Sequence, residues 1–521
     1  MLRKFTAASL AALAVAMAGS AAVAQEDFRS LARTDLQTLH DTLRDNHPAA
    51  VVPGPQGDTF RAWIDRGYTE AQGQLNRVNS GDSAVYLLRS YASGFRDANI
   101  NVEPSYEENV PWYAPQWPGF TTGWRNGQYV VTYVKQGVRG APPVGAVLES
   151  CNGTPAEEYA RNRLDRWEGN LELEADRVRT APYLLWNRNN PFAGQIPGTC
   201  MFKNRPTDRR AREYTLSPIN NDLAGQEAAY RATVFTPTAG RELAVETVGG
   251  RPWIHVHTLV ENQGWAGFNQ QLQEQAAAIR GPSGFVLDLR GADGTGYNSI
   301  ARGYAVANRI WTPEFTVSRQ PEAGQVIHRA TPANREYFAD ALRRMQADPL
   351  FAYENHSVVL QTQRIVEAYD AAIAAGQQTF EVQQAASGAV VGEATSAGGA
   401  NPDQPDPNAG VAAGDVANPV QGSVVVLVDG GCTAGCLDVV DLLIKLPNVR
   451  LVGNVTSADT IFIEPTSLRL PSGYADLRYG HKVWASRQRG NNQPHTPTSV
   501  YTGLPGDEVA VRAWIAGLFG G

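Results

Sequence analysis

The stretch Val424-Val-Val-Leu-Val-Asp-Gly-Gly-Cys-Thr-Ala-Gly-Cys-Leu-Asp438 decides the fold. Its five leading aliphatic residues predict a strand buried on both faces, as in a parallel sheet. Gly430, Gly431 and Gly435 permit a tight turn and close approach of a ligand to the backbone. A helix that begins after such a turn points unpaired N–H groups at whatever occupies it. The stretch therefore predicts a strand, a turn and a helix start with available hydrogen-bond donors.

Ala434 stands at the apex of this turn. In strand–turn–helix sites of acyl transfer, the apex residue carries the attacking atom and nearby N–H groups stabilise the oxyanion. Alanine has no such atom. Thr433, Cys432 and Cys436 are the possible substitutes. Thr433 is one position from the apex, so its side chain is expected to point away from the site. A thiol nucleophile needs a histidine within hydrogen-bond reach. We therefore favour buried thiols or a disulfide for the two cysteines.

Strands alternate with helices around this stretch. Pro252-Trp-Ile-His-Val-His257 and Gly284-Phe-Val-Leu-Asp-Leu-Arg-Gly291 read as strands, and 264–280 and 299–308 as the helices that follow them. A further strand is expected at 449–453. The order predicts an α/β fold with a mostly parallel sheet and right-handed crossovers.

The chain before residue 241 divides into two regions. Leu36, Leu39 and Leu43 form a helical stripe in an N-terminal helical region expected over 25–99. Residues 100–240 are rich in aromatics, prolines and short alternating runs, which predicts β structure. In this second region, strand–turn–strand signals before residue 155 resemble the end of a PDZ-type module, a fold that captures peptide ends.

Two histidines in the N-terminal region, His40 and His47, are seven residues apart. They have no third partner at metal-ligand spacing, so solvated or capping roles are favoured over metal binding.

Residues 1–24 combine basic residues, an alanine-rich apolar run and a small-residue cleavage site before Gln25. This pattern is typical of a secretory signal, and it predicts export to a bacterial periplasm or beyond the cell. No other stretch reaches the roughly 18 apolar residues of a membrane span. The formal net charge of −7 gives no indication of nucleic-acid or anionic-membrane binding.

The chain has four cysteines, Cys151, Cys200, Cys432 and Cys436. An oxidising compartment favours disulfides, and Cys151 with Cys200 is the preferred pair. The Cys-x3-Cys spacing without a second pair is a weak zinc pattern, so no metal and no cofactor are expected.

An insertion interrupts the α/β core, which is expected over 241–521. Residues 320–420 begin with a helical segment from about 332 to 384 and continue into a Gly-, Ala-, Asn- and Pro-rich stretch, 385–419. That composition cannot pack a core. Beside the turn, such an insertion would be either a lid over the site or a surface loop without a functional role.

Three stretches together resemble the C-terminal processing, or tail-specific, serine peptidases and their tricorn-core and retinoid-binding-protein relatives. They are Asp97-Ala-Asn-Ile-Asn-Val102, Leu287-Asp-Leu-Arg-Gly-Ala-Asp-Gly294, and Val424 to Asp438 continued by Val452-Gly-Asn-Val-Thr-Ser-Ala-Asp459. Leu468-Arg-Leu-Pro-Ser-Gly473 is similar to the family's next strand and turn. The resemblance covers roughly residues 34–505 and implies a sheet of the crotonase/ClpP-like type.

The resemblance also implies catalytic positions, and this chain departs from each of them. The serine position holds Ala434, and the histidine position of the tricorn-like branch holds Asn99. The lysine position of the other branch holds Asp459. Gln493 aligns with an acidic residue expected near the Arg-x-Arg stretch. Without a nucleophile or a base at these positions, the serine-peptidase route is closed.

The glycine turns remain as a binding feature. In the family the loop after Asp288-Leu-Arg supplies an oxyanion donor, which implies that Gly291 or Gly294 and the Gly435 N–H bind a carbonyl or carboxylate. An ion pair between Asp288 and Arg290 that holds the sheet is an equally good interpretation of the same motif.

Three functions remain open at this point. The first is a pseudoenzyme that binds polypeptide or C-terminal tails; the second is an active serine or thiol peptidase. The third is small hydrophobic ligand binding, by analogy with the retinoid-binding relatives. The sequence does not define the oligomeric state.

Overall fold

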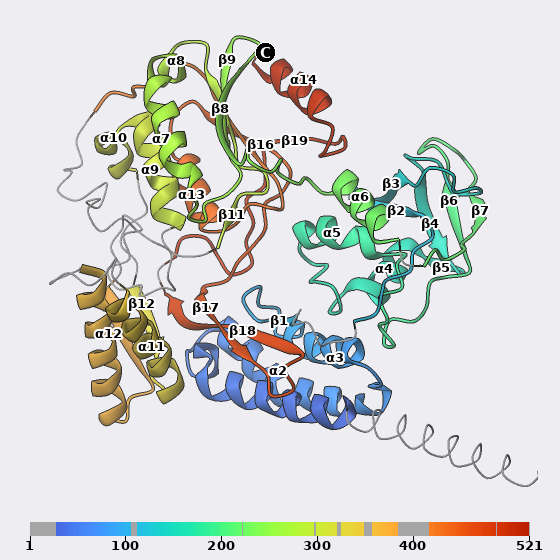
Figure 1. The fold of residues 1–521 in the computed structure, drawn as a ribbon, viewed down its shortest axis with the longest axis horizontal. Coiled ribbons are helices and arrows are strands. Elements are labelled where there is room, and N and C mark those ends of the chain that lie inside the picture. Colours follow the sequence, from blue (N-terminus) through green and yellow to red (C-terminus); the bar gives the residue numbers. More distant parts are fainter. Residues whose placement is uncertain are drawn as a thin grey trace, which may run out of the picture.

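The computed structural model describes residues 28–105, 112–220, 222–295, 299–319, 325–348, 357–383, 416–485 and 487–519. Figure 1 shows three groups of elements that meet at a common junction: a central sheet with its helices, an N-terminal group of helices on a second sheet, and a separate β-rich group. The expected signal segment, 1–24, lies outside the described residues. Most of the low-complexity stretch, 385–419, also lies outside them.

The central sheet is mixed α/β and mostly parallel. Its strands, in spatial order, are β19 (Ser499–Val500), β16 (Val449–Gly453), β14 (Val424–Val428), β10 (Phe285–Asp288), β9 (Arg251–Val256) and β8 (Leu243–Val248). Only the β8–β9 pair is antiparallel. Its helices are α7 (Gly264–Glu274), α8 (Ala276–Arg280), α9 (Ser299–Trp311), α10 (Pro313–Val317), α13 (Gly435–Leu443) and α14 (Glu508–Leu518).

β14 is buried along its whole length because both faces of the sheet are covered. Val424, Val426 and Val428 belong to the core that includes α7, α9 and α13. Val425 and Leu427 belong to the core on the other face, formed with α14. The alternation follows from the two-residue period of a strand.

The N-terminal helices pack on a second, antiparallel sheet. The helices are 28–46, η1 (Pro48–Ala50), α2 (Pro55–Gln72), η2 (Leu75–Arg77) and α3 (Gly81–Ser93). The strands are β1 (Asn101–Pro104), β12 (Gln325–Arg329), β13 (Thr379–Gln383), β17 (Phe462–Arg469) and β18 (Ala475–Trp484). The helical stripe of Leu36, Leu39 and Leu43 is fully buried in this core with Phe462 and Leu477.

The insertion is not purely helical, which corrects the expectation for its first part. α11 (Pro332–Ala347) and α12 (Ser357–Ala374) pack together, as helices were expected to do. They are flanked by β12 and β13, and β12 pairs with β18. The two short strands escaped prediction because their partner lies far along the chain.

The β-rich group has its own antiparallel sheet. The strands are β2 (Phe120–Arg125), β3 (Gln128–Val134), β4 (Val147–Cys151), β5 (Thr154–Pro155), β6 (Thr199–Lys203) and β7 (Arg212–Thr215). The helices are α4 (Ala156–Leu164), α5 (Glu174–Thr180), η3 (Ala181–Tyr183) and α6 (Leu223–Thr233). Cys151 and Cys200 face each other on β4 and β6 and form a disulfide. None of the described helices combines the length and apolarity needed to cross a bilayer.

Candidate functional site

The turn between β14 and α13 has the backbone of a strained elbow. Ala434 lies at its apex with φ +48° and ψ −121°. A residue with a Cβ in this region costs about 1–3 kcal/mol and persists only where its surroundings hold it. A serine nucleophile of an elbow site occupies the same kind of strained strand-to-helix turn. Here the residue in the strained conformation is alanine, whose side chain carries no attacking atom.

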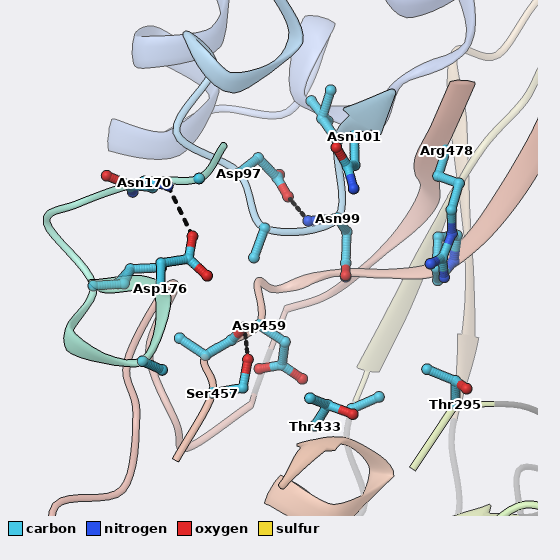
Figure 2. Close-up of a pocket in the computed structure, with 18 of the residues that line it drawn as sticks. Asp97, Asn99, Asn101, Asn170, Asp176, Thr295, Thr433, Ser457, Asp459 and Arg478 are labelled. Atoms are coloured by element: carbon cyan, nitrogen blue, oxygen red, sulfur yellow. Dashed lines mark hydrogen bonds between the residues drawn. The ribbon is translucent and has the colours of Figure 1, made fainter. Parts of the chain in front are cut away.

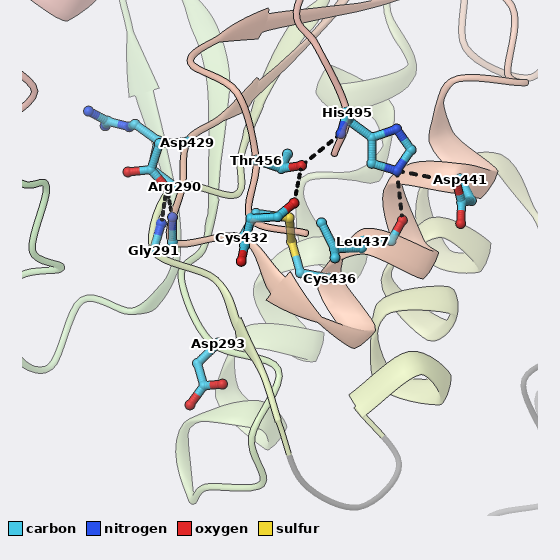
Figure 3. Close-up of a disulfide and its surroundings, with 12 residues drawn as sticks. Arg290, Gly291, Asp293, Asp429, Cys432, Cys436, Leu437, Asp441, Thr456 and His495 are labelled. Atoms are coloured by element: carbon cyan, nitrogen blue, oxygen red, sulfur yellow. Dashed lines mark hydrogen bonds and ion pairs between the residues drawn. A yellow bond between two sulfur atoms is a disulfide. The ribbon is translucent and has the colours of Figure 1, made fainter. Parts of the chain in front are cut away.

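Two features hold the apex. Cys432 and Cys436 form a disulfide that spans it, which Figure 3 shows beside the start of α13. The short strand β15 (Thr433–Ala434) pairs with β11 (Asp293–Gly294) from the loop after β10. The disulfide corrects the possibility that Cys432 or Cys436 is a substitute nucleophile, because neither sulfur is a free thiolate.

Asp429 joins the two glycine turns. Its Oδ1 accepts the N–H of Gly291 at 2.8 Å and the N–H of Gly431 at 2.9 Å (Figure 3). This corrects the expectation for Gly291, whose donor is already engaged. Asp288 and Arg290 do form the expected buried ion pair, with Nη2 2.7 Å from Oδ2.

Gly294 and Gly435 lie against each other at the start of α13. A Cβ on residue 294 would lie 2.3 Å from the amide nitrogen of Cys436 and 2.7 Å from that of Gly435, so only glycine fits there. The helix has no side-chain cap at Ala434. Its first N–H groups therefore remain candidate donors toward a bound carbonyl or carboxylate.

A cavity of about 830 Å³ opens on this turn. Its walls come from the loop after α3, from residues 168–188 of the β-rich group, from the elbow and from β17 and β18 (Figure 2). Most of the site residues proposed from the sequence line it: Asn99, Gly294, Thr433, Ala434, Gly435 and Asp459. Residues far apart in the chain thus converge on one site.

Gln493 does not join them, which corrects its assignment. Its side chain is exposed, and its amide oxygen accepts the N–H of Gly490 at 2.8 Å. It closes a local turn. None of the histidines that the structure describes lines the cavity. His495, beside the disulfide in Figure 3, directs Nε2 at the carbonyl of Leu437 and at Asp441.

Thr433 lines the cavity, but nothing in the described structure activates its hydroxyl. No hydrogen bond joins its side chain to a described residue, and an alcohol needs an adjacent base to become a nucleophile. The threonine alternative is therefore not supported by the geometry.

Asn99 has a structural partner. Its Nδ2 donates to the carbonyl of Phe462 at 2.7 Å, and its own N–H donates to Oδ1 of Asp97 at 2.8 Å (Figure 2). The amide side chain thus ties the loop after α3 to the start of β17. Asn99 therefore holds this part of the cavity wall in place, and its amide transfers no proton.

Asp97 and His47 form a buried pair that sequence reasoning did not identify. Nε2 of His47 lies 4.0 Å from Oδ2 of Asp97. His47 has the capping role that was favoured for it: its Nδ1 accepts the N–H of Ala49 at the start of η1. Burial lowers the pKa of His47 to about 3, and burial raises the pKa of Asp97 to about 7.

The raised pKa of Asp97 predicts a pH effect on stability. A folded-state pKa of about 7, above the unfolded value of 3.8, favours the folded state below about pH 4. That contribution is lost as the pH rises toward 7. Asp97→Asn keeps an acceptor for the N–H of Asn99. We expect its free energy of unfolding to exceed that of wild type by about 2–4 kcal/mol, with the difference growing from pH 5 to pH 8. Urea unfolding of both proteins at these pH values measures it, and a pH-independent difference would contradict the assignment.

A buried ion cluster supports the cavity floor. Arg489 donates to Asp438 at 2.6 Å and to Asp441 at 3.1 Å, and it also pairs with Asp459. Arg487 reaches Asp438 at 3.0 Å and Asp459 at 2.8 Å. Burial raises the pKa of Asp459 to about 6 in spite of these arginines. Asp459 is therefore engaged in the cluster with both arginines.

Arg478 differs from the other arginines of the cavity. Arg89, Arg96, Arg179 and Arg188 each pair with a carboxylate. The guanidinium of Arg478, on β18, makes no hydrogen bond or ion pair with a described residue, and Figure 2 shows the side chain extending along the cavity wall. An unpaired guanidinium on a cavity wall is a ready partner for a carboxylate.

The comparisons with known proteins concern the fold. No protein-family model matches the sequence, and no curated protein matches it. Mature CPAF matches with a TM-score of 0.58 at 11% identity, over 94% of this chain and 96% of CPAF. The chain has the fold of mature CPAF.

A second structure, CPAF complexed with lactacystin, matches with a TM-score of 0.56 at 12% identity, over 95% of this chain and 99% of CPAF. The photosystem II D1 C-terminal processing protease matches with a TM-score of 0.34 at 11% identity, over 92% of this chain and 96% of that one. The likeness to CPAF extends over nearly the whole chain. What these comparisons establish is a fold shared with CPAF.

Proposed function

We propose that this protein is an exported, peptidase-like binding protein that holds the C-terminal tail of a polypeptide in the cavity and does not cleave it. The observation that carries the proposal is the strained elbow with alanine at its apex. The turn has the strained conformation, a disulfide across it and helix-start donors, while its apex residue carries no attacking atom and no described histidine lines the cavity. Such a site binds a carbonyl without attacking it.

The cavity suits a peptide end. Its volume of about 830 Å³ lies in the usual range of ligand sites, about 300–1,000 Å³. In the proposed complex the terminal carboxylate pairs with Arg478, and a backbone carbonyl accepts N–H groups at the start of α13, beside Gly294 and Gly435. The walls carry many arginines and carboxylates, so a small hydrophobic ligand is not favoured.

Both disulfides fit the export that the N-terminal segment predicts, because disulfides persist in oxidising compartments. We infer a periplasmic or extracellular location on these grounds. Detection of the processed protein in a periplasmic fraction, with its N-terminus near Gln25, would test this.

The role of Arg478 is testable with short peptides that end in a free carboxylate. We expect Arg478→Gln to weaken binding of a free-acid peptide about 10–100-fold, because a charge-assisted hydrogen bond contributes about 1.5–3 kcal/mol. Fluorescence anisotropy measures the affinity. Arg343→Gln, on the exposed side of α11, is the matched control and is expected to bind as wild type does.

The same peptide with a C-terminal amide separates two possible failures. If Arg478 holds the carboxylate, wild type should bind the amide more weakly than the acid by the same factor. Arg478→Gln should bind the amide and the acid with equal affinity. Equal binding of acid and amide would reject the anchor and leave peptide binding intact. Absence of binding by a diverse set of free-acid peptides would reject the proposed function itself.

A further inference from the structure

A second polar cluster lies outside the cavity, between the central sheet and α14. His255 and His257 are two residues apart at the end of β9, so their side chains emerge on the same face. Asp288 on β10 is the cross-strand neighbour of His255. All three are buried, with 8%, 7% and 0% of their surfaces exposed, respectively.

The three facing donor atoms are almost equidistant. Nδ1 of His255 lies 3.4 Å from Nε2 of His257 and 3.4 Å from Oδ2 of Asp288, and Nε2 of His257 lies 3.3 Å from the same oxygen. Hydrogen bonds usually span about 2.7–3.2 Å, so none of the three contacts is a good one. A tetrahedron around zinc with bonds of about 2.0–2.1 Å has edges of about 3.3–3.4 Å. The triangle therefore matches one face of a tetrahedral metal site.

The side chains around these three residues orient the histidine rings in the way that outer-sphere partners usually orient metal ligands. The other ring nitrogen of His255, Nε2, lies 3.0 Å from Oε1 of Glu246, the carboxylate partner expected for a ligating histidine. Glu246 is held in turn by Arg512 at 2.6 Å. Nδ1 of His257 is buried without a described hydrogen-bond partner. The ring is thus not committed to another acceptor.

Asp288 is oriented by its neighbours as well. Oδ1 accepts from Nε of Arg290 at 2.9 Å and from its backbone N–H at 3.1 Å. Oδ2 accepts from Nη2 of Arg290 at 2.7 Å and from Nε1 of Trp253 at 3.4 Å. These bonds fix the carboxylate. The positive charge of Arg290 also weakens the attraction of Asp288 for a cation, so the affinity is expected to be lower than that of a site with an unpaired carboxylate.

We propose that His255, His257 and Asp288 form a binding site for a zinc ion. Two imidazoles and one carboxylate are a ligand set that suits zinc and is poor for magnesium or calcium, which prefer oxygen ligands. The ion would join the ends of β9 and β10, directly before the loop that carries Gly294 to the elbow. This site is separate from the peptide cavity and does not depend on the proposed function.

Titration of the full, tag-free protein with zinc chloride after chelator treatment tests the site. We expect one equivalent to bind in isothermal titration calorimetry, and cobalt chloride to give the visible absorption of tetrahedral cobalt. Glu246→Gln should weaken zinc binding about 10–100-fold by removing the partner of His255. His257→Gln should abolish saturable binding at this site. Magnesium chloride should not compete.

His40→Gln is the matched control, since it removes a histidine that also contacts two aspartates. It should bind zinc as wild type does. Circular dichroism confirms the fold of each variant, and the cobalt spectrum of wild type needs no variant. The proposal is overturned if wild type binds no more zinc than a His255→Gln, His257→Gln double variant. It is also overturned if cobalt gives no tetrahedral spectrum.

Discussion

Arg489→Met is expected to lower the free energy of unfolding by about 3–5 kcal/mol, because Arg487 alone does not compensate the buried carboxylates that the two arginines share. Arg489 is 4% exposed and contacts Asp438, Asp441 and Asp459. Methionine fills similar volume, so the loss comes from the uncompensated charges. Chemical unfolding at pH 8 measures the change.

The pH dependence identifies the cause of that loss. Burial raises the pKa values of Asp438 and Asp459, the latter to about 6, so both carboxylates are protonated more readily at pH 5. The cost of Arg489→Met should therefore be smaller at pH 5 than at pH 8. Arg343→Met, whose ion pairs are exposed, should cost at most about 1 kcal/mol at either pH. Equal losses in the two variants would contradict the importance of the buried cluster.

Ala434→Ser combined with Asn99→His is expected to create a serine that reacts with fluorophosphonates. Both positions line the cavity, and the elbow already holds the apex conformation. A positioned base contributes about 10²–10⁴-fold, so the double variant should be labelled about a hundredfold faster than Ala434→Ser alone. Labelling followed by gel fluorescence measures the rates.

The two single variants separate the parts of this prediction. Asn99→His alone should remain unlabelled, because it supplies a base without a nucleophile. If the double variant reacts no faster than Ala434→Ser, residue 99 is not placed to act as the base. Labelling of wild type at the rate of the double variant would show that another residue is the nucleophile.

The elbow could be predicted from local signals. The five aliphatic residues of 424–428 indicated a buried strand, and the glycines that follow indicated a turn and a helix start. The N-terminal helical stripe of Leu36, Leu39 and Leu43 was equally clear, because a 3.6-residue period needs no information about the rest of the fold. The mostly parallel central sheet followed from the alternation of these elements.

Contacts between segments distant in the chain were harder to predict from the sequence. Whether the Gly291 N–H was free depended on Asp429, which approaches from the end of another strand. The family resemblance places Gln493 at the site, but its side chain closes the turn at Gly490 and does not line the cavity. The Asp97–His47 pair needed the packing of η1 against the loop after α3. Such outcomes depend on tertiary packing, which no local pattern encodes.

Arg478 shows the same limit for the site. An arginine in an alternating strand is usually a solvated side chain, and only the structure reveals that its guanidinium is unpaired on the wall of the cavity. The histidines of β9 were visible in the sequence, but their approach to Asp288 depends on the register of β9 and β10.

The most direct test of the central claim is incubation of wild-type protein with a bound free-acid tail peptide, followed by the intact mass of the recovered peptide. We predict saturable binding and an unchanged mass over a day at every pH from 5 to 8. Peptide fragments that accumulate with wild type would contradict it. If cleavage then followed the titration of a group near pH 6–7, Asp97 and Asp459 would be the first residues to substitute.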